Sequence, residues 1–110
     1  MSLDVSLTET LPTEVYWANI THNLGKMAKE AGIYYYLWRP EEIIHSPVIH
    51  ARQLIQALEK GLEVLKSDPE RFKDFNPANG WGNYESLIRF VENYLKSCRE
   101  YPDSIVEVSR

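Results

Sequence analysis

The N-terminal segment of the chain alternates apolar and polar residues. The alternation covers 3–8, and its apolar positions are Leu3, Val5 and Leu7. This period of two is typical of a strand with one buried face, because successive side chains point to opposite faces. After a break at 11–13, residues 15–20 are rich in β-branched and aromatic types, which suit a pleated surface. We predict a β-hairpin, and a helix capped at Thr13 is the competing interpretation of the second segment.

A short helix is predicted directly after the hairpin. Thr21 can cap it by accepting a hydrogen bond from an amide one turn on. Apolar residues then recur at helical spacing, namely Leu24, Met27, Ala28 and Ala31. Gly32 supplies the stop. Residues 33–40 show no clean period, and we interpret them as an aromatic-rich connection with room for a turn of helix.

Two longer segments have the pattern of amphipathic helices. The first is expected to begin at Ser46 and Pro47, a capping residue followed by proline at the first helical position. Its apolar stripe comprises Val48, Ala51, Leu54, Ile55, Leu58, Leu62 and Leu65. A second Asp-Pro cap predicts a turn or two of helix over 68–72, followed by a loop over 76–82. Asn83 is expected to cap the last helix, whose stripe comprises Tyr84, Leu87, Ile88, Val91, Tyr94, Leu95 and Cys98.

These elements predict an α+β fold. Residues 105–108 are short and β-branched, and we expect them to join the N-terminal hairpin as an edge strand. The small antiparallel sheet would pack on two main amphipathic helices and one short helix. With 110 residues, of which 44% are hydrophobic, the chain is expected to form a single domain over 1–110.

Composition narrows the classes of partner. The chain has 12 Lys and Arg against 16 Asp and Glu, a formal net charge of -4. This is the wrong sign for a general polyanion binder, so we expect binding to neither nucleic acid nor membranes. No apolar run approaches the roughly 20 residues of a membrane span. One cysteine and the lack of a basic start followed by an apolar run predict a cytoplasmic protein.

The segment 17–23 joins an aromatic strand to an Asn-Ile-Thr-x-Asn step. Together with the Gly-Ile-Tyr segment at 32–34 and the helices expected from Ser46 and Asn83, it makes the chain resemble small uncharacterised proteins of bacterial and phage genomes. The resemblance spans most of the chain, and the function of that family is unknown. It implies a fold and a phage-associated class, and it implies no catalytic residues.

Hydrogen-bonding side chains gather where the hairpin leads into the first helix. One interpretation is a small-molecule or metal-binding site, conceivably that of a hydrolase, using Asn19, His22 and Asn23, because amides at a helix start favour polar ligands. The other is structural, with Thr21 or Asn23 capping the helix and Asn19 tying the strand end to a neighbouring backbone. We favour the structural interpretation.

A carboxylate and an imidazole could share a face further along the chain. Glu41 and Glu42 lie four and three positions before His45, and His50 follows. A metal site needs three or four converging ligands, and the Ser-Pro step at 46–47 interrupts this run. We therefore expect a solvated surface with no metal and no cofactor.

Nucleophilic catalysis has one candidate residue, Cys98. It lies on the apolar stripe of the last predicted helix, so we expect a buried, inert thiol. The sequence has no nucleophile elbow, glycine-rich phosphate loop or Cys/His zinc pattern. We therefore lean towards a protein that is not an enzyme.

Aromatic residues and an arginine are concentrated in two predicted connections. The run 34–39 contains three consecutive tyrosines, Trp38 and Arg39, and Trp81 lies in a glycine-flanked loop. These residue types are enriched at binding hot spots, and loops often carry recognition groups. The competing interpretation is that the rings close the core of a small sheet. Three consecutive tyrosines cannot all point inward, so at least one ring is expected at the surface.

We expect a non-enzymatic interaction domain of the phage-associated type. Its partner is an unknown protein, and a second copy of the chain, paired through an edge strand or the tyrosine-rich connection, is one candidate. The candidate surface comprises Asn19, His22, Asn23, Tyr35, Trp38, Arg39 and Trp81. The alternative is the small-molecule or metal site around Asn19, His22 and Asn23.

Overall fold

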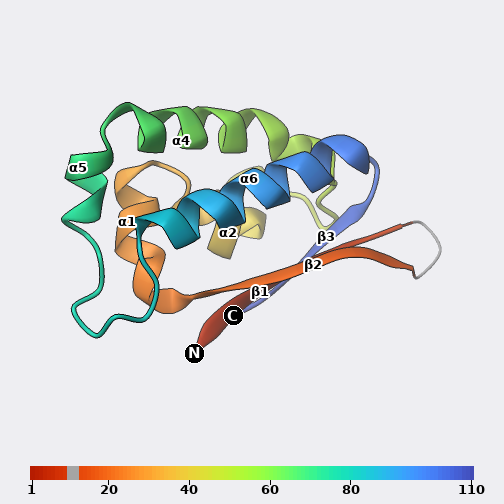
Figure 1. Cartoon of the computed structure of the whole chain (residues 1–110). Helices are drawn as coiled ribbons and strands as arrows, with labels where there is room; N and C mark the ends of the chain where they lie inside the picture. The colour runs from red at the N-terminus through yellow and green to blue at the C-terminus, as the bar shows by residue number, and fades with distance from the viewer. Residues whose placement is uncertain (10–12) are drawn as a thin grey trace.

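A three-stranded antiparallel sheet forms one layer of the molecule (Figure 1). This computed structural model describes residues 1–9 and 13–110. The strand order is β2-β1-β3, and the strands are β1 Ser2–Thr8, β2 Glu14–Thr21 and β3 Ile105–Ser109. The hairpin, the C-terminal edge strand and the α+β fold class are confirmed.

The central strand β1 pairs antiparallel with β2 on one side and with β3 on the other. Val5 of β1 lies opposite Ala18 of β2 on one side and opposite Val108 of β3 on the other. The helical interpretation of the second segment is therefore wrong. The predicted break at 11–13, apart from its last residue, lies outside the described residues.

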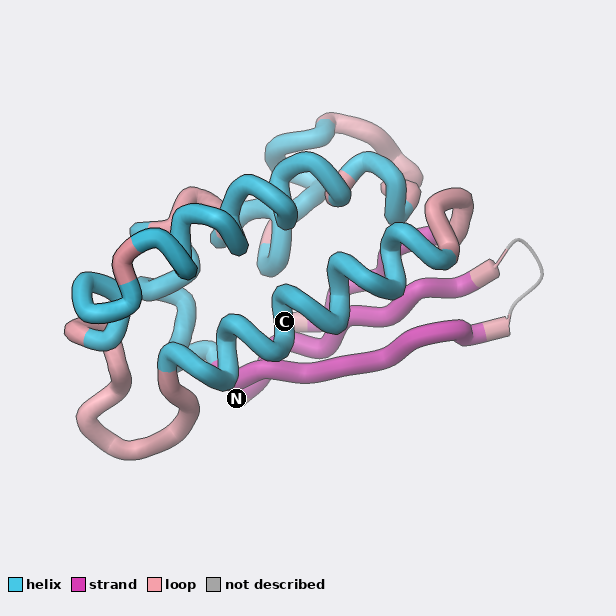
Figure 2. Tube along the Cα trace, turned by 45° about the horizontal axis from the view of Figure 1, so that its top comes forward, coloured by secondary structure: helices cyan, strands magenta, loops and turns pink. Residues whose placement is uncertain are grey.

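The sheet has one covered and one open face. Leu3, Val5 and Leu7 are fully buried, whereas the alternate residues of β1 are only partly buried. The labelled helices lie on one side of the sheet, as Figures 1 and 2 show from two directions, and the burial of these three side chains places them on that side. The other face of the sheet is left to solvent, which explains the clean alternation in β1.

The segment after the hairpin is helical and begins as predicted. The hydroxyl of Thr21 accepts a hydrogen bond from the backbone N–H of Asn23 (3.3 Å). A 3-10 turn η1 (His22–Leu24) leads into α1 (Gly25–Glu30). The stop at Gly32 has a positive φ of 81°, a conformation that glycine adopts without strain.

The aromatic connection contains two short helices. They are α2 (Tyr34–Trp38) and α3 (Pro40–Ile44). Pro40 keeps Arg39 out of helical geometry, as expected, but it then occupies the first position of α3, where its missing N–H has no cost. The expected connection with room for a turn of helix thus contains two such helices, one on each side of Arg39.

The expected start of the first main helix at Ser46 and Pro47 is wrong. The hydroxyl of Ser46 donates to the carbonyl of Val48 (2.7 Å) instead of capping a helix. The chain continues in extended form, and the carbonyl of Ile49 accepts a hydrogen bond from the N–H of Val106 in β3 (2.8 Å). This long-range pairing outweighs the local capping pattern, and it leaves the Val48 side chain exposed rather than on the core stripe.

The remaining helices form the layer above the sheet. Their bounds are η2 Ala51–Gln53, α4 Ile55–Ser67, α5 Pro69–Lys73 and α6 Tyr84–Glu100. Asp68 caps α5 and Asn83 caps α6, as the sequence predicts. Helices α4 and α6 pack along each other, and α6 also crosses the covered face beside β2 (Figure 1).

One hydrophobic core lies between the sheet and the helices. It joins the buried side of β1 to the apolar stripes of α4 and α6, and Trp38, Tyr84 and Tyr94 are its largest aromatic members. In the part of the chain that the structure describes, no helix combines the length and the apolar character needed to cross a membrane.

Candidate functional site

The outer edge of β2 carries unpaired backbone groups. The N–H of His22 donates to the carbonyl of Met1 (3.4 Å), so by strand alternation Ile20, Ala18 and Tyr16 point their backbone groups towards β1. The intervening residues Trp17 and Asn19 point their N–H and C=O groups outward. Neither has a backbone partner among the described residues.

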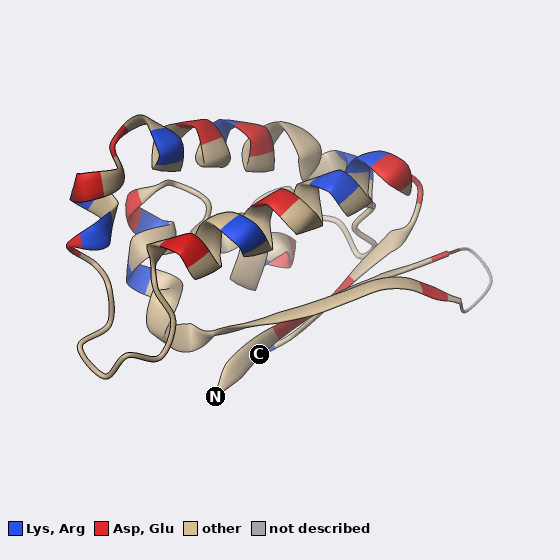
Figure 3. Cartoon of the chain, viewed as in Figure 1, with Lys and Arg blue, Asp and Glu red and all other residues tan. Residues whose placement is uncertain are grey.

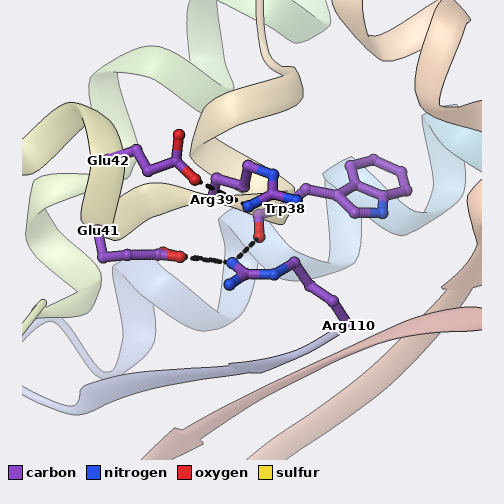
Figure 4. Close-up of polar contacts among 5 residues, drawn as sticks. All are labelled: Trp38, Arg39, Glu41, Glu42 and Arg110. Carbon is purple, nitrogen blue, oxygen red and sulfur yellow. Dashed lines mark hydrogen bonds and ion pairs between the residues drawn. The ribbon is translucent and has the colours of Figure 1, made fainter.

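The opposite edge of the sheet is covered at its start. The extended segment before η2 bonds to β3 through Ile49, and His50 forms a bridge with Ile105. Past the end of β3, Arg110 donates to the carbonyl of Trp38 (2.8 Å) and pairs with Glu41, as Figure 4 shows. Among the described residues, β2 has no such covering segment on its outer edge.

A groove runs between the β2 edge and α6. It encloses about 340 Å³. Tyr16, Ala18 and Phe90 supply its apolar wall, and the tips of Arg89 and Asn93 on α6 are polar. Arg89 forms no ion pair with any described residue. The sequence analysis missed this role for α6, because only the contact with β2 distinguishes these positions from an ordinary solvated helix face.

The open face of the sheet carries one large aromatic side chain. Trp17 is 55% exposed and stands in one row with Ser6 and Glu107. Within the three strands as described, Asp and Glu occur but Lys and Arg do not (Figure 3). The exposed indole therefore lies on a weakly acidic, otherwise polar surface.

Three of the predicted site residues come together at the end of this open face. Asn19, Asn23 and Trp81 line a hollow of about 500 Å³. Thr21 and Asn79 complete its wall with the first residues of the chain. The sequence analysis did not single out Asn79, which is part of an Asn-Gly turn that places Trp81 beside the strand end.

His22 is separated from this hollow. Its ring lies 6.2 Å from that of Trp38 in an edge-on arrangement, and its Nε2 is buried without a hydrogen-bond partner. It lines a different depression, together with Lys26 and Asp74. Asn23 lines both depressions, whereas Asn19 lines only the first and His22 only the second of these two, so the predicted set does not converge on one site.

The aromatic run divides between core and surface. Trp38 is only 3% exposed and stacks on Tyr34, with ring centroids 5.2 Å apart. Its indole is part of the core, so the expectation that Trp38 presents a surface with Arg39 and Trp81 is wrong. Tyr35 is 46% exposed, which confirms that at least one tyrosine faces solvent. Arg39 pairs with Glu42 at 2.8 Å and is not among the residues that line the Trp81 hollow.

The carboxylates considered for a metal site are held by arginines. Glu42 pairs with Arg39 and Glu41 with Arg110 (Figure 4). Desolvation raises the pKa of Glu41, but the hydrogen bond from the Arg110 guanidinium and its charge outweigh this and lower that pKa overall. His45 adopts a left-handed conformation that ends α3. Within residues 1–9 and 13–110, no three His, Cys, Asp or Glu side chains converge as metal ligands do.

Cys98 is buried, as predicted, and its thiol is held neutral. Burial raises the pKa of the Cys98 thiol to about 12. Its neighbours are Tyr16 and the fully buried Tyr94, whose pKa burial also raises. A nucleophilic cysteine needs a lowered pKa in a partly open, electropositive environment, so this thiol is placed for packing.

We expect native Cys98 to resist alkylation at pH 8. Because an unfolded thiol has a pKa of about 8.5, the folded thiolate fraction is on the order of a thousandfold lower. Because the pKa of this thiol is higher in the folded than in the unfolded chain, keeping it protonated stabilises the folded protein below about pH 8.5. This contribution to the free energy of unfolding is lost as the pH rises towards 12. Mass spectrometry after iodoacetamide treatment, with and without urea, measures the difference. Rapid labelling of the folded chain would contradict this assignment.

No family model, no curated protein and no solved structure matches the chain.

Proposed function

We propose that this chain is a non-enzymatic protein-interaction domain that binds through the outer edge of β2. The observation that carries the proposal is the contrast between the two edges of the sheet. Natural sheets protect their edges with lysine, proline, bulges or covering segments. The β3 edge is covered at its start by 49–50, whereas β2 has neither lysine nor proline over Glu14–Thr21 and no covering strand among the described residues. Its register shift lies between Glu14 and Tyr16, so the part from Tyr16 to Thr21 is regular.

We further propose that the occupant of this edge is a second copy of the chain. An antiparallel β2 pair with its two-fold axis at Ala18 would place Trp17 opposite Asn19, and these are residues whose backbone groups point outward. Tyr16 would lie opposite Ile20 on the helix side, which forms an apolar pair. The small Ala18 side chain permits close approach at the axis, and the product is a continuous six-stranded sheet with closed symmetry.

The energetics of such a pair come from the backbone and the groove. Each new main-chain hydrogen bond contributes about 0.5–1.5 kcal/mol net. The incoming strand also covers the apolar wall formed by Tyr16, Ala18 and Phe90, and apolar burial contributes roughly 25 cal/mol per Å². Recognition by strand addition combines these two contributions.

The side chains that could serve nucleophilic or metal chemistry support a binding role over a catalytic one. Cys98 is neutral and buried, and the carboxylates of Glu41 and Glu42 form ion pairs with arginine side chains. Two further properties stay predictions. They are the cytoplasmic compartment, which the cysteine content and the N-terminal pattern predict, and the phage association, which the resemblance implies.

Self-association is expected to be lost in Trp17→Pro and kept in Trp17→Ala. Proline removes the outward N–H of residue 17 but leaves the inward bonds to β1 intact, so the sheet tolerates it at this edge. Alanine removes the same indole and keeps the N–H. Sedimentation velocity over a concentration series should give a dimer for the wild type and Trp17→Ala, and a folded monomer for Trp17→Pro.

Circular dichroism and thermal melts of both variants are the control for folding. A wild-type monomer at all concentrations would contradict the second copy as occupant. A dimer that persists in folded Trp17→Pro would contradict the use of the β2 edge.

A further inference from the structure

The hollow lined by Asn19, Asn23, Asn79 and Trp81 lies at the end of the open face of the sheet, and it shares Asn19 and Thr21 with the lining of the β2–α6 groove. A ligand here does not require the dimer proposed above, although that dimer would place the Trp17 of a second copy beside Asn19 at the margin of the hollow. We propose that this hollow is a binding site for a neutral saccharide. Its volume of about 500 Å³ lies within the roughly 300–1,000 Å³ of typical small-molecule sites.

The polar wall of the hollow consists of side-chain amides. The amides of Asn19 and Asn23 have no hydrogen-bond partner among the described residues, and Asn79 uses its Oδ1 to accept from the N–H of Trp81 (2.9 Å), which leaves its NH₂ free. An amide group donates through nitrogen and accepts through oxygen. A sugar hydroxyl also donates and accepts, so amides can bind adjacent hydroxyls with matched geometry.

Trp81 provides the apolar part of the site. Its side chain is 69% exposed, so packing in the hydrophobic core does not explain a tryptophan at this position. Gly80 and Gly82 flank it with φ values of 76° and 90°, and a Cβ on Gly82 would come within 2.7 Å of Thr21 Cγ2. The tight packing of Gly82 against Thr21 holds the loop, and with it the indole, against the strand end. The C–H face of a pyranose ring is apolar and packs on a flat indole.

The charge of the site selects against other ligand classes. Among the described lining residues there is no Lys, Arg, His, Asp or Glu side chain, and the charged group at the margin is the amino group of Met1. A charged ligand group among the three asparagines and Trp81 would lose hydration without a side-chain counter-charge, and that loss is costly. A neutral ligand with many hydroxyls avoids this penalty.

The proposal is tested by NMR titration of the ¹⁵N-labelled full chain. The probes are the neutral tetrasaccharides of glucose, galactose, mannose, xylose and N-acetylglucosamine, each added separately, with adenosine as a non-saccharide ring compound. At least one tetrasaccharide is expected to shift the Trp81 indole N–H and the side-chain amides of Asn19 and Asn23, at dissociation constants of about 1 mM or below.

Four variants separate binding from folding. Trp81→Ala is expected to weaken binding about tenfold or more, and Trp81→Phe, which keeps an aromatic ring, by less. Asn23→Ala removes a free amide while the backbone N–H that bonds to Thr21 remains, and it should weaken binding about fivefold. Tyr35→Ala alters an exposed aromatic residue that does not line the hollow, and binding should be unchanged.

Three outcomes would overturn the proposal. They are the absence of shifts with every tetrasaccharide, shifts of equal size in folded Trp81→Ala, and a response to adenosine alone. None of these variants alters the outward N–H of Trp17. A failure of saccharide binding would therefore leave the sedimentation result for Trp17→Pro unchanged, and the two proposals can fail independently.

Discussion

Replacing Phe72 with alanine is expected to lower the free energy of unfolding by about 3–5 kcal/mol. Phe72 is fully buried, although α5 spans only Pro69–Lys73. So short a helix has little intrinsic stability in water, and this ring is its main attachment to the core. Truncation leaves a cavity and releases the helix together with the loop that follows it. Urea denaturation monitored by circular dichroism measures the loss.

Phe75→Ala is the matched control for this prediction. Phe75 has the same side chain three residues later but is only partly buried, so its truncation should cost less than half as much. Equal losses for the two variants would show that burial at position 72 is not the cause.

Gly61→Ala is expected to destabilise the protein by about 1–3 kcal/mol. In an exposed helix this substitution would stabilise by about 1 kcal/mol. At this position in α4, however, a Cβ would lie 1.9 Å from Cγ2 of Ile33, a branched side chain that cannot move away freely. Gly61 therefore lets α4 approach Ile33, in the segment between α1 and α2, more closely than a side chain would allow.

A double-mutant cycle tests this contact. Ile33→Ala removes the obstructing group, so Gly61→Ala should cost much less in that background than in the wild type. Gly25→Ala is the matched glycine control, since its Cβ would meet only Tyr34 at 3.6 Å, an ordinary contact, and no loss of stability is expected. Additive costs at positions 61 and 33 would contradict the clash.

The parts of the fold that local patterns determine could be predicted from the sequence. The alternation in β1, the cap at Asn83 and the stripe of α6 depend on residues close together in the chain. The start at Ser46 was mistaken because its competitor is distant, namely the pairing of Ile49 with Val106 in β3. A local capping rule contains no information about a partner strand that lies more than fifty residues away.

The candidate site shows the same division. The polar cluster near Asn19 and the exposed Trp81 were visible in the sequence, because amides and a tryptophan between glycines are unusual at such positions. That Asn79 joins them, that Trp38 is buried, and that His22 faces another surface depend on tertiary packing. The open β2 edge could be identified only after the strand order was known.

Amide hydrogen exchange reports residue by residue whether the outward backbone groups of β2 pair with a second copy. In dilute protein of about 10 μM, the inward N–H groups of Ala18 and Ile20 should be protected and those of Trp17 and Asn19 should exchange rapidly. At about 1 mM, new protection is expected at Trp17 and Asn19 as the dimer forms. Rapid exchange at these two amides across the whole concentration range would contradict this pairing.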